Sequence, residues 1–256
     1  MPETAIRPPK PINPKTASPE QITEARQIRR RWLDDAADWA VRSLTQDDAW
    51  RSFLWTAAMH PSRPRVTNLA LIAVQAPHNV AHTYRQWRAE GRQVRRGEPG
   101  LLIYTSVIKE SEDEGGSPEL RGFGVGTLFA YDQTDPADGA PADGHQQPGP
   151  PTPRTAEELD AAAMVALHAL EQRYDRAQGI PAALAAVAVS RGLSPDEAAS
   201  AAHLAALALD APEVGSAPPP QAQTEETDEV RDAAQRVVEH GRALAQQFAA
   251  LALPPF

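Results

Sequence analysis

The chain has 256 residues, a formal net charge of −9 and no cysteine. The absence of cysteine excludes disulfides, thiolate zinc sites and a cysteine nucleophile, and it fits a reducing cytoplasm. No stretch reaches the roughly 18 apolar residues of a membrane span, and the first residues lack the apolar segment of a signal peptide. We therefore expect a cytoplasmic protein without a membrane partner.

Charge and aromatic residues are distributed unevenly along the chain. Residues 51–109 hold nine Lys and Arg against two acidic residues, Glu90 and Glu98, which gives this segment a net charge of +7. Residues 110–256 hold eight basic and 24 acidic residues and carry a net charge of −16. All five Trp lie before residue 90, so the strongest packing is expected in the first half. The acidic chain therefore contains a basic module.

The first part of the chain is predicted to form helices after a disordered arm. Residues 1–17 are rich in proline and have little to bury, which predicts disorder. A capping sequence at Ser18 starts a helix whose apolar residues recur to about Val41. A second helix is predicted after a Thr cap over residues 45–60, and a third, short and apolar, from about residue 67 to 77.

The pattern changes from helical to extended after a fourth helix. This helix is predicted from about Asn79 to Gly91. Residues 93–95 begin a strand, residues 101–109 form a strand that is apolar on both faces, as in a covered central strand, and residues 123–131 alternate as a third strand. Residues 18–135 are therefore expected to form an α+β domain, with N-terminal helices followed by a small antiparallel sheet.

The second half is predicted to consist of linkers and Ala-rich α-helices. A Pro-rich linker covers residues 136–153, a small helical region covers residues 154–211, a second linker covers 212–224, and a C-terminal helix covers 225–253. Three helices are expected within the helical region, over residues 155–178, 180–191 and 194–209. Because Ala-rich helices build only a thin core, they form either a small bundle or a set of helices that needs a partner.

The first half contains a series of spaced residues: Asn68, Gln75, Pro77, Tyr84, Trp87, Gly91, Arg92, Val94, Gly97, Glu98, Gly100 and Ile103, followed by Phe129, Asp132, Gln133 and Thr134. This series resembles the N-terminal domain of ArdC-type antirestriction proteins, over about residues 20–135. The resemblance implies single-stranded DNA binding and an origin in plasmids or other mobile elements. The series departs from the family in having two residues between Phe129 and Asp132.

The metallopeptidase part of that family is missing from the sequence. Its chemistry needs an H-E-x-x-H helix, with two His ligands for zinc and a Glu as general base. Residues 136–256 contain no such motif. The only His pair four residues apart is His78 and His82, and Asn79 stands where the Glu would be. We therefore expect a binding protein with no cofactor and no catalytic residues.

The candidate binding residues are the cations and polar side chains of the basic module. Single-strand binding needs cations that follow the phosphates and flat side chains on which bases stack. Tyr104 is a candidate stacking residue. Asn68 is either a helix cap or a ligand contact, and Gln75 must find a backbone or ligand partner. The alternative for the helical arginines is an ordinary solvated face. The phosphate candidates are Arg63, Arg65, Arg85, Arg88, Arg92, Arg95, Arg96 and Lys109.

Several functional readings remain open from the sequence. The first is single-stranded DNA binding by an antirestriction-like protein of a mobile element, acting by binding and not by catalysis. The second is an adaptor whose acidic C-terminal helices bind a protein partner, or mimic DNA towards one. A diverged metallopeptidase or nuclease is disfavoured, because H-E-x-x-H is absent and the basic module has only two acidic residues.

Overall fold

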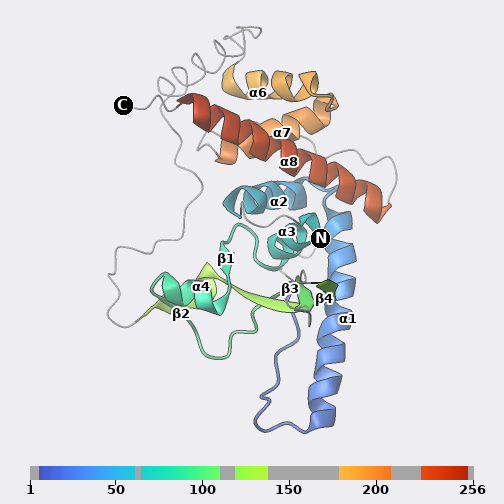
Figure 1. Cartoon of the computed structure of the whole chain (residues 1–256), viewed down its shortest axis with the longest axis vertical. Coiled ribbons are helices and arrows are strands. Elements are labelled where there is room, and N and C mark those ends of the chain that lie inside the picture. Colours follow the sequence, from blue (N-terminus) through green and yellow to red (C-terminus); the bar gives the residue numbers. More distant parts are fainter. Residues whose placement is uncertain (1–5, 61–64, 110–118, 138–178, 209–225, 253–256) are drawn as a thin grey trace.

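The computed structural model describes residues 6–60, 65–109, 119–137, 179–208 and 226–252. Helices and a small antiparallel sheet form an α+β fold, which confirms the predicted fold class (Figure 1). The predicted helix 155–178 and the two linkers, apart from residues 136 and 137, lie outside these ranges, as does Arg63. None of the described helices combines the length and the apolar character needed to cross a membrane.

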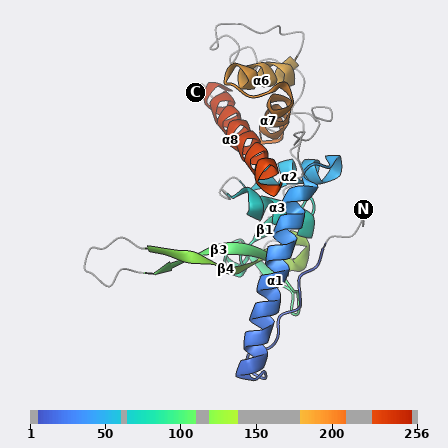
Figure 2. The same cartoon turned by 90° about the vertical axis from the view of Figure 1, so that its right-hand side faces the viewer.

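The first three helices are α1 (Pro19–Ser43), α2 (Asp47–Met59) and α3 (Val66–Gln75). Helix α1 runs along the side of the β-hairpin and extends beyond it (Figures 1 and 2), α3 packs on β3 (Leu101–Lys109), and α2 packs on α3. The predicted start of α1 is confirmed, because Ser18 forms a capping box with Gln21. The predicted Thr cap of α2 is wrong, since its N-cap is Gln46. Of the predicted arm, residues 6–17 are described; in them Pro8 is buried and Ile6 packs against the core.

The sheet has the strand order β1-β4-β3 and is dominated by one long hairpin. Strands β3 (Leu101–Lys109) and β4 (Glu119–Ala130) pair antiparallel, and their outer ends extend away from the helices (Figure 2). Strand β3 is thus an edge strand, not the central strand that its two apolar faces predicted. Its first residues are nevertheless buried on both faces, which explains the pattern.

The predicted fourth helix is shorter than expected. Strand β1 (Ala81–His82) occupies its first part and pairs with the end of β4. A capping box at Thr83 then starts α4 (Tyr84–Ala89), on which Tyr84 is half exposed and not buried as predicted. Strands β2 (Arg92–Val94) and β5 (Thr134–Pro136) form a second small sheet, and the 3-10 turn η1 (Tyr131–Gln133) leads into β5.

The C-terminal helices pack on the N-terminal ones. Helices α6 (Gly179–Ser190), α7 (Pro195–Ala208) and α8 (Thr227–Ala252) lie above α2 and α3 in Figure 1, and one continuous apolar cluster joins both sets. The Trp50 indole Nε1 donates to Ser200 Oγ at 3.3 Å. Arg242 of α8 donates to the carbonyl oxygens of Ala57 and His60, at the end of α2. The partner that these helices need is therefore the first half of the same chain.

Candidate nucleic-acid interface

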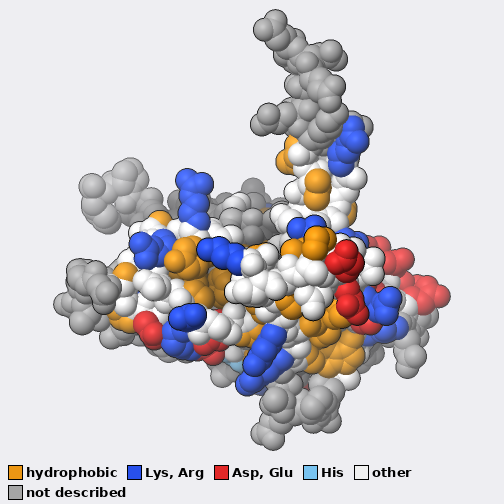
Figure 3. All heavy atoms as spheres, turned by 90° about the horizontal axis from the view of Figure 1, so that it is seen from below, with side chains coloured by type: hydrophobic (Ala, Val, Ile, Leu, Met, Phe, Trp, Pro, Cys, Tyr) orange, Lys and Arg blue, Asp and Glu red, His pale blue; other side chains and the backbone are white. Residues whose placement is uncertain are grey.

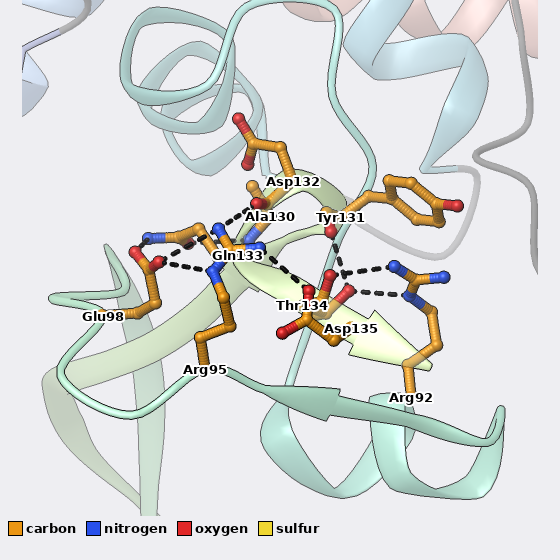
Figure 4. Close-up of polar contacts among 9 residues, drawn as sticks. All are labelled: Arg92, Arg95, Glu98, Ala130, Tyr131, Asp132, Gln133, Thr134 and Asp135. Carbon is orange, nitrogen blue, oxygen red and sulfur yellow. Dashed lines mark hydrogen bonds and ion pairs between the residues drawn. The ribbon is translucent and has the colours of Figure 1, made fainter. Parts of the chain in front are cut away.

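Arg92 is buried and serves the fold. Its side chain is 5% exposed, its Nε donates to Thr134 Oγ1 at 2.7 Å, and its Nη2 donates to the Thr134 carbonyl at 2.9 Å (Figure 4). Its guanidinium carbon lies 3.8 Å from the centre of the Tyr131 ring. These contacts join β2 to η1 and β5. The prediction that Arg92 contacts phosphate is therefore replaced by a structural role.

Arg95 is exposed, but acidic neighbours offset its charge. It donates to Glu98 Oε1 and to Asp135 Oδ1, each at 3.2 Å, and to the carbonyl of Asp132 (Figure 4). The hydrogen bond to Asp135, together with the charges of both carboxylates, raises the pKa of Arg95. A phosphate would have to compete with both carboxylates for this guanidinium.

The other predicted cations near α4 are solvent-facing. Arg85 and Arg88 lie on the exposed side of α4, and Arg96 lies in the turn after β2. Arg88 donates to Gln93 Oε1 at 3.3 Å, whereas Arg85 and Arg96 make no hydrogen bond or ion pair within the described ranges. Lys109 ends β3, and its side chain is not described. Of the four exposed arginines here, Arg85, Arg88 and Arg96 have no carboxylate partner in the described ranges, whereas Arg95 has two.

Asn68 and Gln75 connect α3 to the edge of β3. Asn68 Nδ2 donates to the Tyr104 carbonyl at 2.9 Å, and its Oδ1 accepts from the Tyr104 N–H at 3.0 Å. Gln75 makes the same two bonds to Leu102, both at 2.9 Å. The two amides are seven residues apart and therefore lie on the same side of α3, and their partners are two alternate residues of β3, whose backbone groups face the same edge of the sheet. For Gln75 the backbone is the partner, and Asn68 is not the cap of α3, which is Arg65.

The glycine and polar residues of the family pattern connect the turn after β2 to the turn η1. Gln133 donates to Glu98 Oε2 at 3.1 Å and accepts from the Ala130 N–H at 2.9 Å (Figure 4). Gly100 has a φ of +67°, and a Cβ there would lie 2.5 Å from the Thr127 side chain. Only glycine fits this position without displacing β4. This part of the pattern therefore specifies the turns around β2 and η1.

A second group of cations and aromatic rings lies between α1, α3 and the hairpin. Arg30 of α1 donates to the Phe123 carbonyl at 2.6 Å, and its guanidinium carbon is 5.4 Å from the centre of the Tyr104 ring. Arg65, at the start of α3, lies 4.0 Å above the Phe123 ring. We call Arg30, Tyr104, Phe123 and Arg65 the basic-aromatic strip. In it each of two guanidinium groups lies against one ring, and the hydrogen bond from Arg30 to the Phe123 carbonyl joins the two pairs.

The surroundings of the strip hold charges of both signs. Arg26 and Arg31 are exposed on α1 beside Arg30, and Arg30 Nε pairs with Asp34 Oδ1 at 3.0 Å. Seen from below, the molecule shows Lys and Arg side chains interspersed with hydrophobic ones, together with Asp and Glu side chains (Figure 3). Tyr104 Oη donates to Asp34 Oδ1 at 2.7 Å. Partial burial and this carboxylate raise the pKa of Tyr104, so the ring stays neutral at physiological pH.

Sequence patterns identified only half of the strip. Arg65 and Tyr104 were predicted, whereas Arg30 was not among the candidate residues and Phe123 was predicted only as the first residue of a strand. Arg30 and Phe123 are 93 residues apart in sequence, and no local pattern links them. The available signal was the spacing of Arg26 and Arg30, which places both on one side of a helix.

No metal site is present in the described ranges. No group of three or more His, Cys, Asp and Glu side chains there is arranged to hold a metal ion. His82 lies in β1 and His78 in the preceding turn, so the pair does not sit on one helix face. His82 Nε2 is 3.8 Å from a Glu90 carboxylate oxygen.

Comparison with known proteins supports the sequence pattern. Residues 50–137 match the family model described as the N-terminal domain of anti-restriction factor ArdC. The predicted resemblance is confirmed for this segment. The metal-free crystal structure of the antirestriction ArdC protein from plasmid R388 aligns with 86% of this chain and 98% of that chain, at 19% identity and a TM-score of 0.41. No curated protein matches the chain. The ArdC match contains Arg65, Tyr104 and Phe123 of the strip, whereas Arg30 precedes it.

Proposed function

We propose that the chain binds single-stranded DNA through the basic-aromatic strip and acts as an antirestriction protein by binding, without catalysis. The observation that carries the proposal is the pairing of Arg30 with the Tyr104 ring and of Arg65 with the Phe123 ring, joined by the hydrogen bond from Arg30 to the Phe123 carbonyl. Single strands are held by cations that follow the backbone and by rings that stack on bases. The antirestriction role rests on the match of residues 50–137 to the N-terminal domain of anti-restriction factor ArdC.

The geometry favours a single strand over a duplex. The strip extends over α1, β3, β4 and the start of α3. Its rings can stack on unpaired bases, whereas the faces of the bases in a duplex are already stacked on one another. A guanidinium that lies on one face of a ring can bind a phosphate with its outer N–H groups, and a base can stack on the outer face of the guanidinium or on the free face of the ring. If Arg26, Arg30, Arg31 and Arg65 each contact one phosphate, the log–log slope of affinity against salt should be about −3.

The test is fluorescence anisotropy of a labelled strand of about 20 nucleotides with the full-length chain, with the duplex as competitor at two salt concentrations. The variant Arg30→Gln/Arg65→Gln should bind roughly tenfold more weakly, with a shallower salt dependence. Arg85→Gln/Arg96→Gln removes the same charge from the α4 region and should have a smaller effect.

Three outcomes would contradict the proposal. Absence of salt-sensitive binding by the wild type removes the single-strand function and directs attention to a protein partner of the C-terminal helices. A larger loss in the α4 variant moves the interface to the arginines of α4 and the β2 turn. A duplex that competes as well as the single strand excludes the strand preference. Circular dichroism of each variant verifies that it is folded.

A further inference from the structure

A cavity of about 470 Å³ lies at one end of the basic-aromatic strip. It opens where α8 meets α1, α3 and the hairpin, and its lining includes Arg65, Tyr104 and Phe123 of the strip. This volume falls in the range of small-ligand pockets, roughly 300–1,000 Å³. A group carried by a strand on the strip can therefore enter it.

The charges around the cavity are balanced. Two carboxylates line it, Asp38 from α1 and Asp232 from α8, and two guanidinium groups, Arg65 and Arg231, line it as well. The four formal charges sum to zero. A flat and uncharged polar group matches such a lining, with an attached phosphate near an arginine.

The cavity offers free hydrogen-bonding groups of both kinds. Asp38 and Asp232 are exposed and make no hydrogen bond or ion pair with the described part of the chain, so their oxygens can accept. Arg65 also makes no hydrogen bond there, and the buried Nε of Arg231 has no partner, so both arginines can donate. A ligand that fills the cavity should therefore present N–H donors to the two carboxylates and a carbonyl oxygen to an arginine.

We propose that the cavity binds one base of the single strand and prefers guanine over thymine. The inference rests on the single-strand binding proposed above and adds a base preference to it. The Watson–Crick edge of guanine presents two adjacent donors, N1–H and the N2 amino group, which a carboxylate accepts side by side. The same edge of thymine presents one N–H between two carbonyl oxygens, which the carboxylates repel. Exposed bases of single strands are read at these edges.

The experiment compares a short labelled dT strand with the same strand carrying one central dG, using the full-length chain. The wild type should bind the dG strand roughly tenfold more tightly. Asp38→Asn/Asp232→Asn should bind the dT strand as well as or better than the wild type, because two negative charges are removed, and should lose the preference for dG. Asp35→Asn/Asp196→Asn removes the same charge from exposed positions outside the cavity and should keep the preference.

The outcomes separate this inference from the proposed function. Equal affinity of the wild type for both strands overturns the base preference and leaves strand binding intact. If Asp38→Asn/Asp232→Asn raises both affinities equally and keeps the preference, the two carboxylates act only as charges and the inference is wrong. If neither strand binds, calorimetric titration with dGMP and dTMP at low salt tests the cavity alone. Tighter binding of dGMP that the double variant abolishes supports it, and equal or no binding overturns it.

Discussion

At the scale of single residues, two amide side chains determine how α3 meets the sheet. Asn68 and Gln75 are 8% and 6% exposed, and each bonds both backbone groups of one residue of β3. A buried backbone group without a partner costs about 1–3 kcal/mol. The resemblance placed both residues in the binding site, whereas the structure uses them to fix the position of β3, and thereby of Tyr104 in the strip.

Replacing Gln75 by Leu should therefore reduce stability without changing the interface directly. The substitution keeps the size of the side chain but leaves the buried N–H and carbonyl of Leu102 unpaired, so we expect a loss of about 3 kcal/mol in urea unfolding. Gln246→Leu on the exposed side of α8 is the control and should change stability by less than about 0.5 kcal/mol. A Gln75→Leu variant that stays as stable as wild type, yet loses DNA affinity, would restore the ligand role of Gln75.

At the scale of elements, α7 and α8 approach closely at one glycine. A Cβ added to Gly241 would lie 2.7 Å from Leu204 Cδ2 and 2.9 Å from Leu204 Cβ. Alanine in a helix is normally favoured over glycine by roughly 1 kcal/mol. At position 241 we expect alanine to be less favourable than glycine. The added Cβ would clash with Leu204 Cβ and Cγ, which cannot move away without shifting the helix.

Gly241→Ala should thus destabilise the chain by about 1–2 kcal/mol, as overpacking does in other cores. Leu204→Ala alone should cost about 2–4 kcal/mol through the cavity it creates. The double variant should lose clearly less than the sum, because the added methyl group occupies part of that cavity. Chemical denaturation of the wild type, the two single variants and the double variant gives the coupling free energy between positions 204 and 241. If Gly241→Ala stabilises the chain, α7 and α8 are farther apart than described.

At the scale of the whole molecule, both halves of the chain share one apolar core. Leu184 of α6 is fully buried. All five Trp residues precede residue 90 and therefore lie far from Leu184 in sequence. If the core is continuous, Leu184→Ala should lower the stability detected by Trp fluorescence by about 3 kcal/mol, with the same midpoint by circular dichroism. An unchanged Trp transition, with a separate early loss of helix, would show that α6–α8 unfold independently.

The sequence predicts what depends on neighbouring residues. The capping box at Ser18 and the strand over residues 101–109 were both identified, because each depends on residues that are close in sequence. Strand β1 was missed because its two residues are held by pairing with Phe129 and Ala130, far along the chain. Alternation within residues 79–91 cannot reveal such a pairing.

The candidate site was harder to predict for the same reason. The charge count correctly located a basic module, but it could not show that Arg92 is buried against Thr134 and Tyr131 or that Asp135 neutralises Arg95. These partners lie about 40 residues away and only meet when β2 pairs with β5. Arg30 contacts Phe123, which is 93 residues away in sequence.

The hydrogen bonds from the two amide side chains of α3 to β3 also affect the tendency of the protein to aggregate. An open strand edge offers unpaired N–H and carbonyl groups to any extended chain, and it is a common starting point for aggregation. At Leu102 and Tyr104 the side chains of Gln75 and Asn68 already occupy the positions that a further strand would take. This part of β3 is therefore closed to strand addition, and the sheet ends at α3 without a partner strand.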